Sequence, residues 1–113
     1  MSEFLYLYRG GQRPTSSPEQ MQQMMQKWLA WMKQLGDQGR LKEPGHPLDS
    51  TGRVVTGKQK TVTDGPYAEK DIVGGYSIVE ARDFGHAVEL SHGCPIFEIG
   101  GTVEIRPVMK IDR

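Results

Sequence analysis

Hydrophobic residues change their spacing along the chain, and each change marks a new secondary-structure element. Phe4 to Tyr8 is apolar at every position, which predicts a central strand buried on both faces. Between Met21 and Leu35 the apolar residues recur at spacings of three and four, which predicts an amphipathic helix. Ser17 and Pro18 suit its N-cap and first position, and Gly39 suits the residue after its C-terminal cap.

The middle of the chain is less regular. Arg40 to Gly52 contains two prolines and two glycines and is predicted to be an irregular loop. Arg53 to Thr56 and Gln59 to Thr63 are predicted strands that flank Gly57-Lys58, the signature of a tight hairpin. A third strand is predicted from Gly75 to Ala81.

The C-terminal third predicts one more helix and one more strand. Asp83 suits the N-cap of a helix that runs to about His92, and Thr102 to Val108 alternates as a strand does. The order is then strand, helix, hairpin and strand, helix, strand. This order predicts an α+β domain over residues 1–113: a ferredoxin-like split βαβ fold with an extra hairpin, whose antiparallel sheet has two helices on one face.

Such a sheet leaves its second face uncovered. The alternation along the last two predicted sheet strands places Tyr76, Ile78, Val103 and Ile105 on that face. An exposed apolar face of this size is typical of an interface. The pattern therefore predicts a homodimer that packs through the sheet face about a twofold axis, as a dimeric α/β barrel does.

Composition narrows the possible classes of function. Lys and Arg total 14, as do Asp and Glu, so the formal charge is zero and no global field favours nucleic acid. One cysteine excludes an internal disulfide. No apolar run is long enough to cross a membrane and the N-terminus lacks the pattern of a signal peptide, so the expectation is a cytoplasmic protein without membrane contact.

The segment Thr61–Ala81 is the first place to look for a site. Asp64-Gly65-Pro66 interrupts a strand and starts a loop to Lys70, and Gly74-Gly75 allows close approach of another group. The alternative is that this loop only sets the geometry of a turn.

Acid/base chemistry needs a carboxylate or a histidine as proton carrier. The candidates are Asp64, Asp49 and His46, with His86 and His92 as weaker ones. Each has a structural alternative: Asp64 is suited to begin a turn, and Asp49 and His46 suit a solvated loop.

Ligand contacts are expected from three further residues. Tyr67 and Arg106 could orient an aromatic or anionic ligand, although Arg106 could equally pair with a neighbouring acid. Trp28 could line an apolar cavity, although core packing is the alternative. The three histidines lack metal-ligand spacing and no nucleotide-binding glycine motif is present, so no metal and no cofactor are expected.

Several motifs together resemble a known family. Val62-Thr63-Asp64-Gly65-Pro66-Tyr67-Ala68-Glu69, then Gly74-Gly75-Tyr76, Cys94-Pro95 and Val103 to Val108 resemble the DGPF-type branch of the YCII-related proteins, with Tyr67 where Phe is usual. The resemblance covers nearly the whole chain. It implies a ferredoxin-like fold and a dimeric α/β barrel.

The same resemblance suggests two kinds of function. Some YCII-related proteins are similar to isomerases and dehydrochlorinases that act on small organic acids with a His–Asp pair, but the first predicted helix here contains no histidine. Asp64 matches the motif, and Asp49 lies in a Pro-Leu-Asp-Ser stretch like the acidic position of such relatives. The alternative is a non-catalytic small-ligand-binding or regulatory module, linked to transcription through a protein partner.

Overall fold

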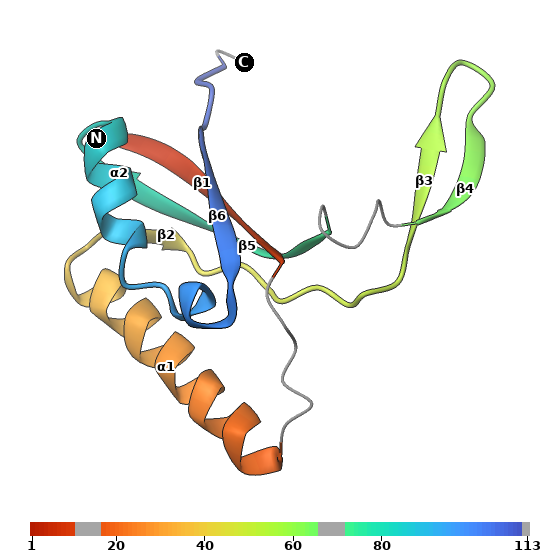
Figure 1. The fold of residues 1–113 in the computed structure, drawn as a ribbon. Helices are drawn as coiled ribbons and strands as arrows, with labels where there is room; N and C mark the ends of the chain where they lie inside the picture. The colour runs from red at the N-terminus through yellow and green to blue at the C-terminus, as the bar shows by residue number, and fades with distance from the viewer. Residues whose placement is uncertain (11–16, 66–71, 112–113) are drawn as a thin grey trace.

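The computed structural model describes residues 1–10, 17–65 and 72–111. Its elements follow one another along the chain as Figure 1 shows, and their bounds are: β1 (Ser2–Gly10), α1 (Pro18–Asp37), β2 (Leu41–Glu43), β3 (Gly52–Thr56), β4 (Thr61–Gly65), β5 (Val73–Ala81), α2 (Phe84–Ser91), the 3₁₀ helix η2 (Pro95–Ile99) and β6 (Gly101–Pro107).

Four strands form an antiparallel sheet in the order β2-β5-β1-β6. If these four strands are numbered 1 to 4 in chain order, their order across the sheet is 2-3-1-4, which is the split βαβ arrangement. The predicted α+β, ferredoxin-like fold is confirmed, and β1 is central as expected. Strands β3 and β4 form a separate two-stranded sheet, the extra hairpin.

The core lies between the sheet and the helices. Alternate residues of β1 point to this side, where Tyr6 stacks on Trp31 with ring centroids 6.2 Å apart. Tyr8 meets the edge of Trp28 at 4.9 Å, and its hydroxyl bonds to the Ser77 hydroxyl at 2.9 Å. Because α1 contributes both tryptophans and α2 adds Ala87 to the same cluster, the two helices cover one face of the sheet.

Local sequence determines where α1 begins and ends. The Ser17 side chain accepts a hydrogen bond from the Gln20 amide, and Pro18 occupies the first helical position. Gly39 has a φ of +71°, and the amide of Arg40 reaches back to the Leu35 carbonyl at 2.9 Å. This is a complete Schellman termination, so both predicted ends are confirmed.

The segment predicted as an irregular loop contains a strand. Leu41–Glu43 is β2, which pairs with β5 at the edge of the sheet. Beyond it the chain keeps following β5 through a bridge between Pro47 and Gly75 and a bond from the Leu48 amide to the Gly74 carbonyl. The strand was missed because Pro44, Gly45 and Pro47, which follow it directly, are typical of a loop, yet prolines are accommodated at a sheet edge.

The hairpin differs from its predicted form in register and place. Its turn spans residues 57–60 rather than Gly57-Lys58 alone, so β4 runs to Gly65 and Asp64 is a strand residue paired with Arg53. The expectation that Asp64 starts a turn is therefore wrong. Part of the predicted loop, residues 66–71, lies outside the described residues.

The hairpin projects from the body of the molecule, and residues 52–65 are called the arm below (Figure 1). Among the described strands, none of the main sheet pairs with it. The radius of gyration is 15.8 Å, whereas a compact chain of this length has roughly 13 Å. The arm accounts for the extended shape, with principal dimensions of 48 × 46 × 19 Å.

Candidate functional site

The face of the sheet opposite the helices is called the open face. At its centre two cross-strand pairs lie side by side, Leu5 with Ile78 and Leu7 with Tyr76. All four side chains are only partly buried within one chain. They form an apolar strip over the two central strands.

The prediction for the open face is half right. Tyr76 and Ile78 lie on it, but Val103 and Ile105 pack on the helix side with the core. Register explains the difference, because Val103 is opposite Tyr8 and Ile105 is opposite Tyr6, and cross-strand partners share a face. Leu5 and Leu7 take their place, and the alternation of aromatic and aliphatic residues in β1 was the signal that could have found them.

Charged groups border the apolar strip on β6. Glu104 lies opposite Leu7 and accepts from the Arg9 guanidinium. Its other oxygen is 3.6 Å from the Arg106 guanidinium, which lies opposite Leu5. Two guanidinium groups therefore share one carboxylate beside partly buried apolar side chains. This arrangement suits an organic anion with an apolar body.

His46 lies at the opposite edge of the open face. Its ring meets Tyr76 edge to face, with centroids 6.4 Å apart. Gly45 makes this approach possible: it has a φ of +73°, and a Cβ there would lie 1.8 Å from the Tyr76 carbonyl oxygen. The chain can follow β5 this closely only with glycine at this position.

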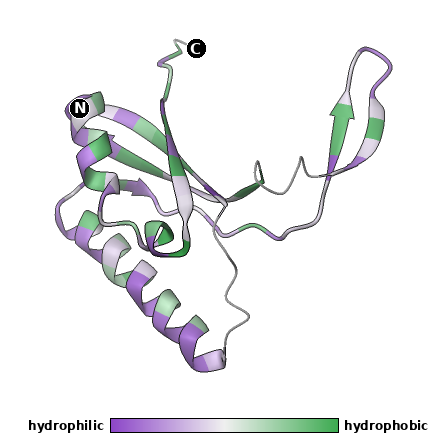
Figure 2. Cartoon of the chain, in the orientation of Figure 1, coloured by the Kyte–Doolittle hydropathy of each residue, from purple (hydrophilic) through white to green (hydrophobic). Residues whose placement is uncertain are grey.

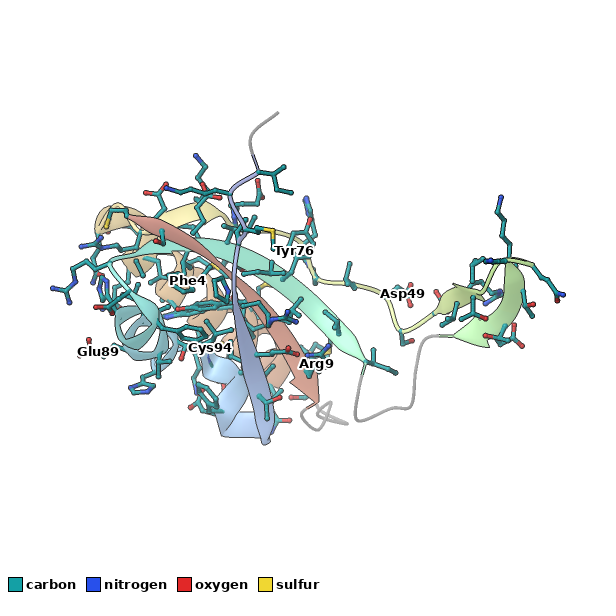
Figure 3. All side chains as sticks on the ribbon, turned by 90° about the horizontal axis from the view of Figure 1, so that it is seen from above. Phe4, Arg9, Asp49, Tyr76, Glu89 and Cys94 are labelled. Carbon is teal, nitrogen blue, oxygen red and sulfur yellow. The ribbon has the colours of Figure 1, made fainter. Side chains whose placement is uncertain are left out.

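The two aspartates predicted as acid/base groups lie apart from His46. Asp49 is exposed on the connection between the body and the arm (Figure 3), where it accepts from the Thr51 amide at 3.3 Å. Asp64 is on the arm, with 96% of its side chain exposed, and lies 3.6 Å from the Arg53 guanidinium. Within the described residues no hydrogen bond or ion pair joins these three groups.

The predicted ligand-binding residues have different surroundings. Trp28 is half-buried and packs on Tyr8 and Trp31. Arg106 is on the open face with 65% of its side chain exposed. Tyr67 lies outside the described residues. The structure thus places Arg106 and His46 on one surface, and Trp28 in the aromatic core.

A cleft lies outside the open face, at the end of the sheet where β1 begins and β6 ends. It has a volume of about 930 Å³ and is lined by the N-terminal residues, Phe84 and the segment after β6. Phe84 meets Phe4 edge to face at 5.5 Å in this lining, which also contains charged residues such as Glu80 and Arg82. None of the residues predicted as acid/base groups lines it.

Among the described residues, the titratable side chains of Tyr6, Tyr8 and Cys94 are buried in the core. Burial raises the pKa of the Tyr6 and Tyr8 hydroxyls well above its ordinary value. Burial likewise raises the pKa of the Cys94 thiol to about 11, so the thiol is protonated at neutral pH. These groups serve packing and hydrogen bonding: the Tyr6 hydroxyl donates to the Ala87 carbonyl.

Residues 1–10, 17–65 and 72–111 contain no group of three or more His, Cys, Asp or Glu side chains placed to hold a metal ion. Over the same residues, no helix combines the length and hydrophobicity needed to cross a membrane.

The fold and the open face define a small α+β protein with a ferredoxin-like sheet, one side of which is covered by the described helices. The model of the YCII-related domain matches residues 4–112, and the chain belongs to this family. A search of curated proteins finds no match. Among solved structures the chain is similar to 5-chloro-2-hydroxyhydroquinone dehydrochlorinase from Burkholderia phenoliruptrix AC1100, in complex with 2,5-dihydroxybenzoquinone, at 18% identity, over 92% of this chain and 90% of that chain, with a TM-score of 0.45.

Proposed function

We propose that the protein is a homodimer that binds a small organic anion at its open face. The observation that carries the proposal is the apolar strip of Leu5, Leu7, Tyr76 and Ile78, bordered by the two guanidinium groups that share Glu104. Aliphatic and aromatic side chains that are only partly buried at the centre of a sheet favour burial against a second surface.

A second copy of the chain suits this face because the face carries charges of both signs. Glu104 of β6 lies between the guanidinium groups of Arg9 and Arg106, while toward the opposite edge of the sheet Lys42 lies 3.9 Å from Glu3. A twofold axis brings the same patch from both copies together, so a face that carries both signs of charge meets its complement.

The ligand is expected at the border between the apolar strip and the arginines. A carboxylate can take a bidentate bond from a guanidinium, and Tyr76 and Leu7 offer an apolar surface for the rest of the molecule. A second copy over the face would exclude water and strengthen the charge-assisted bond.

The dimer is tested by Ile78→Arg and sedimentation velocity at micromolar concentration. A guanidinium forced into the proposed interface should weaken the dimer by more than about 100-fold. Leu29→Arg is the matched control, because Leu29 is 62% exposed on α1 and lies away from the open face. A wild-type protein that sediments as a monomer contradicts the proposal.

The ligand class is tested with benzoate as the probe and benzyl alcohol as its neutral counterpart. We expect benzoate to shift the amide resonances of β5 and β6, and Arg106→Gln to weaken its binding by about 10-fold or more, the value of a charge-assisted hydrogen bond. Equal binding of the two probes, or equal binding by the variant, would refute a role for Arg106.

A second candidate function is acid/base catalysis on the same class of ligand. It is favoured by the position of His46, whose ring contacts Tyr76 on the open face. Histidine can transfer protons at neutral pH. The wild-type protein should then catalyse the exchange of deuterium from solvent into the acidic C–H position of a small carboxylic acid, and His46→Gln should not. If wild type exchanges no proton in any of a set of such acids, the catalytic candidate is wrong and the binding function stands.

A further inference from the structure

The arm presents hydrophobic residues that no other described part of the chain covers. Val55 and Val62 are cross-strand partners, and their exposed fractions are 59% and 61%. The ion pair of Arg53 and Asp64 lies on the same face of the hairpin, because those residues are two positions away on each strand. In Figure 2 hydrophobic positions appear on the arm as well as in the body.

A hairpin of this kind is poorly stabilised by itself. Two strands without a third strand or a covering helix are marginal in water. Their free edges and exposed β-branched residues favour pairing with another molecule. The length and composition of the arm therefore indicate a contact surface rather than a simple connection.

The arm is placed beside the open face. In Figure 1 α1 lies on one side of the sheet and the arm rises toward the other side. The view from above agrees, because there the strands cover α1 while the arm extends past the end of the sheet near Arg9. A second copy seated on the open face would therefore lie alongside the arm.

The open face alone makes a small interface. Four strands about 4.8 Å apart and about seven residues long, at a rise of about 3.4 Å per residue, have a flat footprint of roughly 450 Å². A stable interface typically buries roughly 800 Å² of accessible surface on each partner. The arm supplies further contact area that continues from the same side of the molecule.

We propose that the arm docks on a second copy of this chain, with its Val55–Val62 face against that copy, so that each protomer places its Arg53–Asp64 pair on the other. This inference rests on the proposed homodimer. It also gives the aspartate of the Asp-Gly-Pro motif a place in the assembly, because the Asp64 side chain is 96% exposed and its ion pair within the described residues is with Arg53 of the same arm.

Hydrogen–deuterium exchange of the backbone amides of β3 and β4 tests the docking directly. In the wild-type dimer we expect these amides to be protected, and in the monomeric Ile78→Arg variant at least about 10-fold less protected, because the free hairpin opens readily. A dimer whose arm amides exchange as fast as those of the monomer overturns the docking and leaves the proposed homodimer intact. A monomeric wild type overturns both.

Substitution on the two faces of the arm tests which one makes the contact. Val55→Lys combined with Val62→Lys should raise the dimer dissociation constant by about 100-fold or more, since the proposed contact would lose two valines from each protomer. Thr56→Lys with Thr61→Lys adds the same charge to the other face and should change it less than about threefold. Equal effects of the two double variants would refute the assignment of the docking face.

Discussion

Gly45 gives the sharpest test of how the edge of the open face is built. Replacement by alanine meets two separate obstacles. The residue has a φ of +73°, a conformation that costs an L-residue about 1–2 kcal/mol. The new Cβ would also lie 1.8 Å from the Tyr76 carbonyl oxygen, so the segment after β2 must move away from β5. Such overpacking costs about 1–3 kcal/mol.

The expected total for Gly45→Ala is a loss of about 2–5 kcal/mol, a large part of the stability of an ordinary domain. Gly39→Ala is the matched control. Gly39 has nearly the same φ, +71°, but no heavy atom lies within 4 Å of the position that a Cβ would take there. It should therefore lose only the conformational part, about 1–2 kcal/mol.

The assay is equilibrium unfolding in urea, followed by tryptophan fluorescence, because Trp28 and Trp31 both lie in the core cluster. All variants are compared at one protein concentration, since a dimer makes the free energy of unfolding concentration-dependent. If the two variants differ by less than about 0.5 kcal/mol, the close approach to Tyr76 is not a constraint and the reasoning fails.

Two further predictions concern the helix and the core. Gly36→Ala should stabilise the protein by about 0.5–1 kcal/mol, because Gly36 is helical and open space surrounds its Cα; a loss of stability in urea unfolding would contradict this. The free energy of unfolding should also fall between about pH 9 and pH 11. Burial raises the pKa of the Cys94 thiol to about 11, so the thiol ionises at lower pH in the unfolded chain than in the folded one. The contribution of the protonated, buried thiol to stability is therefore complete below about pH 9 and is lost as the pH rises to about 11. Ionisation of Cys94 should account for about 2–3 kcal/mol of this fall in the free energy of unfolding. Cys94→Ala should abolish that part, and a variant whose stability depends on pH as the wild type does would refute the assignment.

Residues with strong local signals were placed correctly from the sequence. Ser17, Pro18 and Gly39 act within one or two turns of the helix they bound, so their effects do not depend on the rest of the fold. Asp83 is a second example, since its side chain accepts from the His86 amide at 2.8 Å as an N-cap does.

Residues of the candidate site depended on partners far away in the sequence. Alternation in β6 is equally compatible with Val103 on either face, and only its pairing with Tyr8 decides which face that is. Asp64 reads as a turn former next to Gly65, but its register against Arg53 makes it a strand residue. For these positions the local pattern carries no information about the pairing.

By itself the sequence determined the fold class, the two capped helices and the central position of β1, because periodicity and capping act over a few neighbouring residues. Only the tertiary structure decided that Leu41–Glu43 completes the sheet, that Leu5 and Leu7 rather than Val103 and Ile105 form the open face, and that the hairpin stands apart as an arm. The physical reason is that strand partners and sheet faces are set by hydrogen bonds between distant segments.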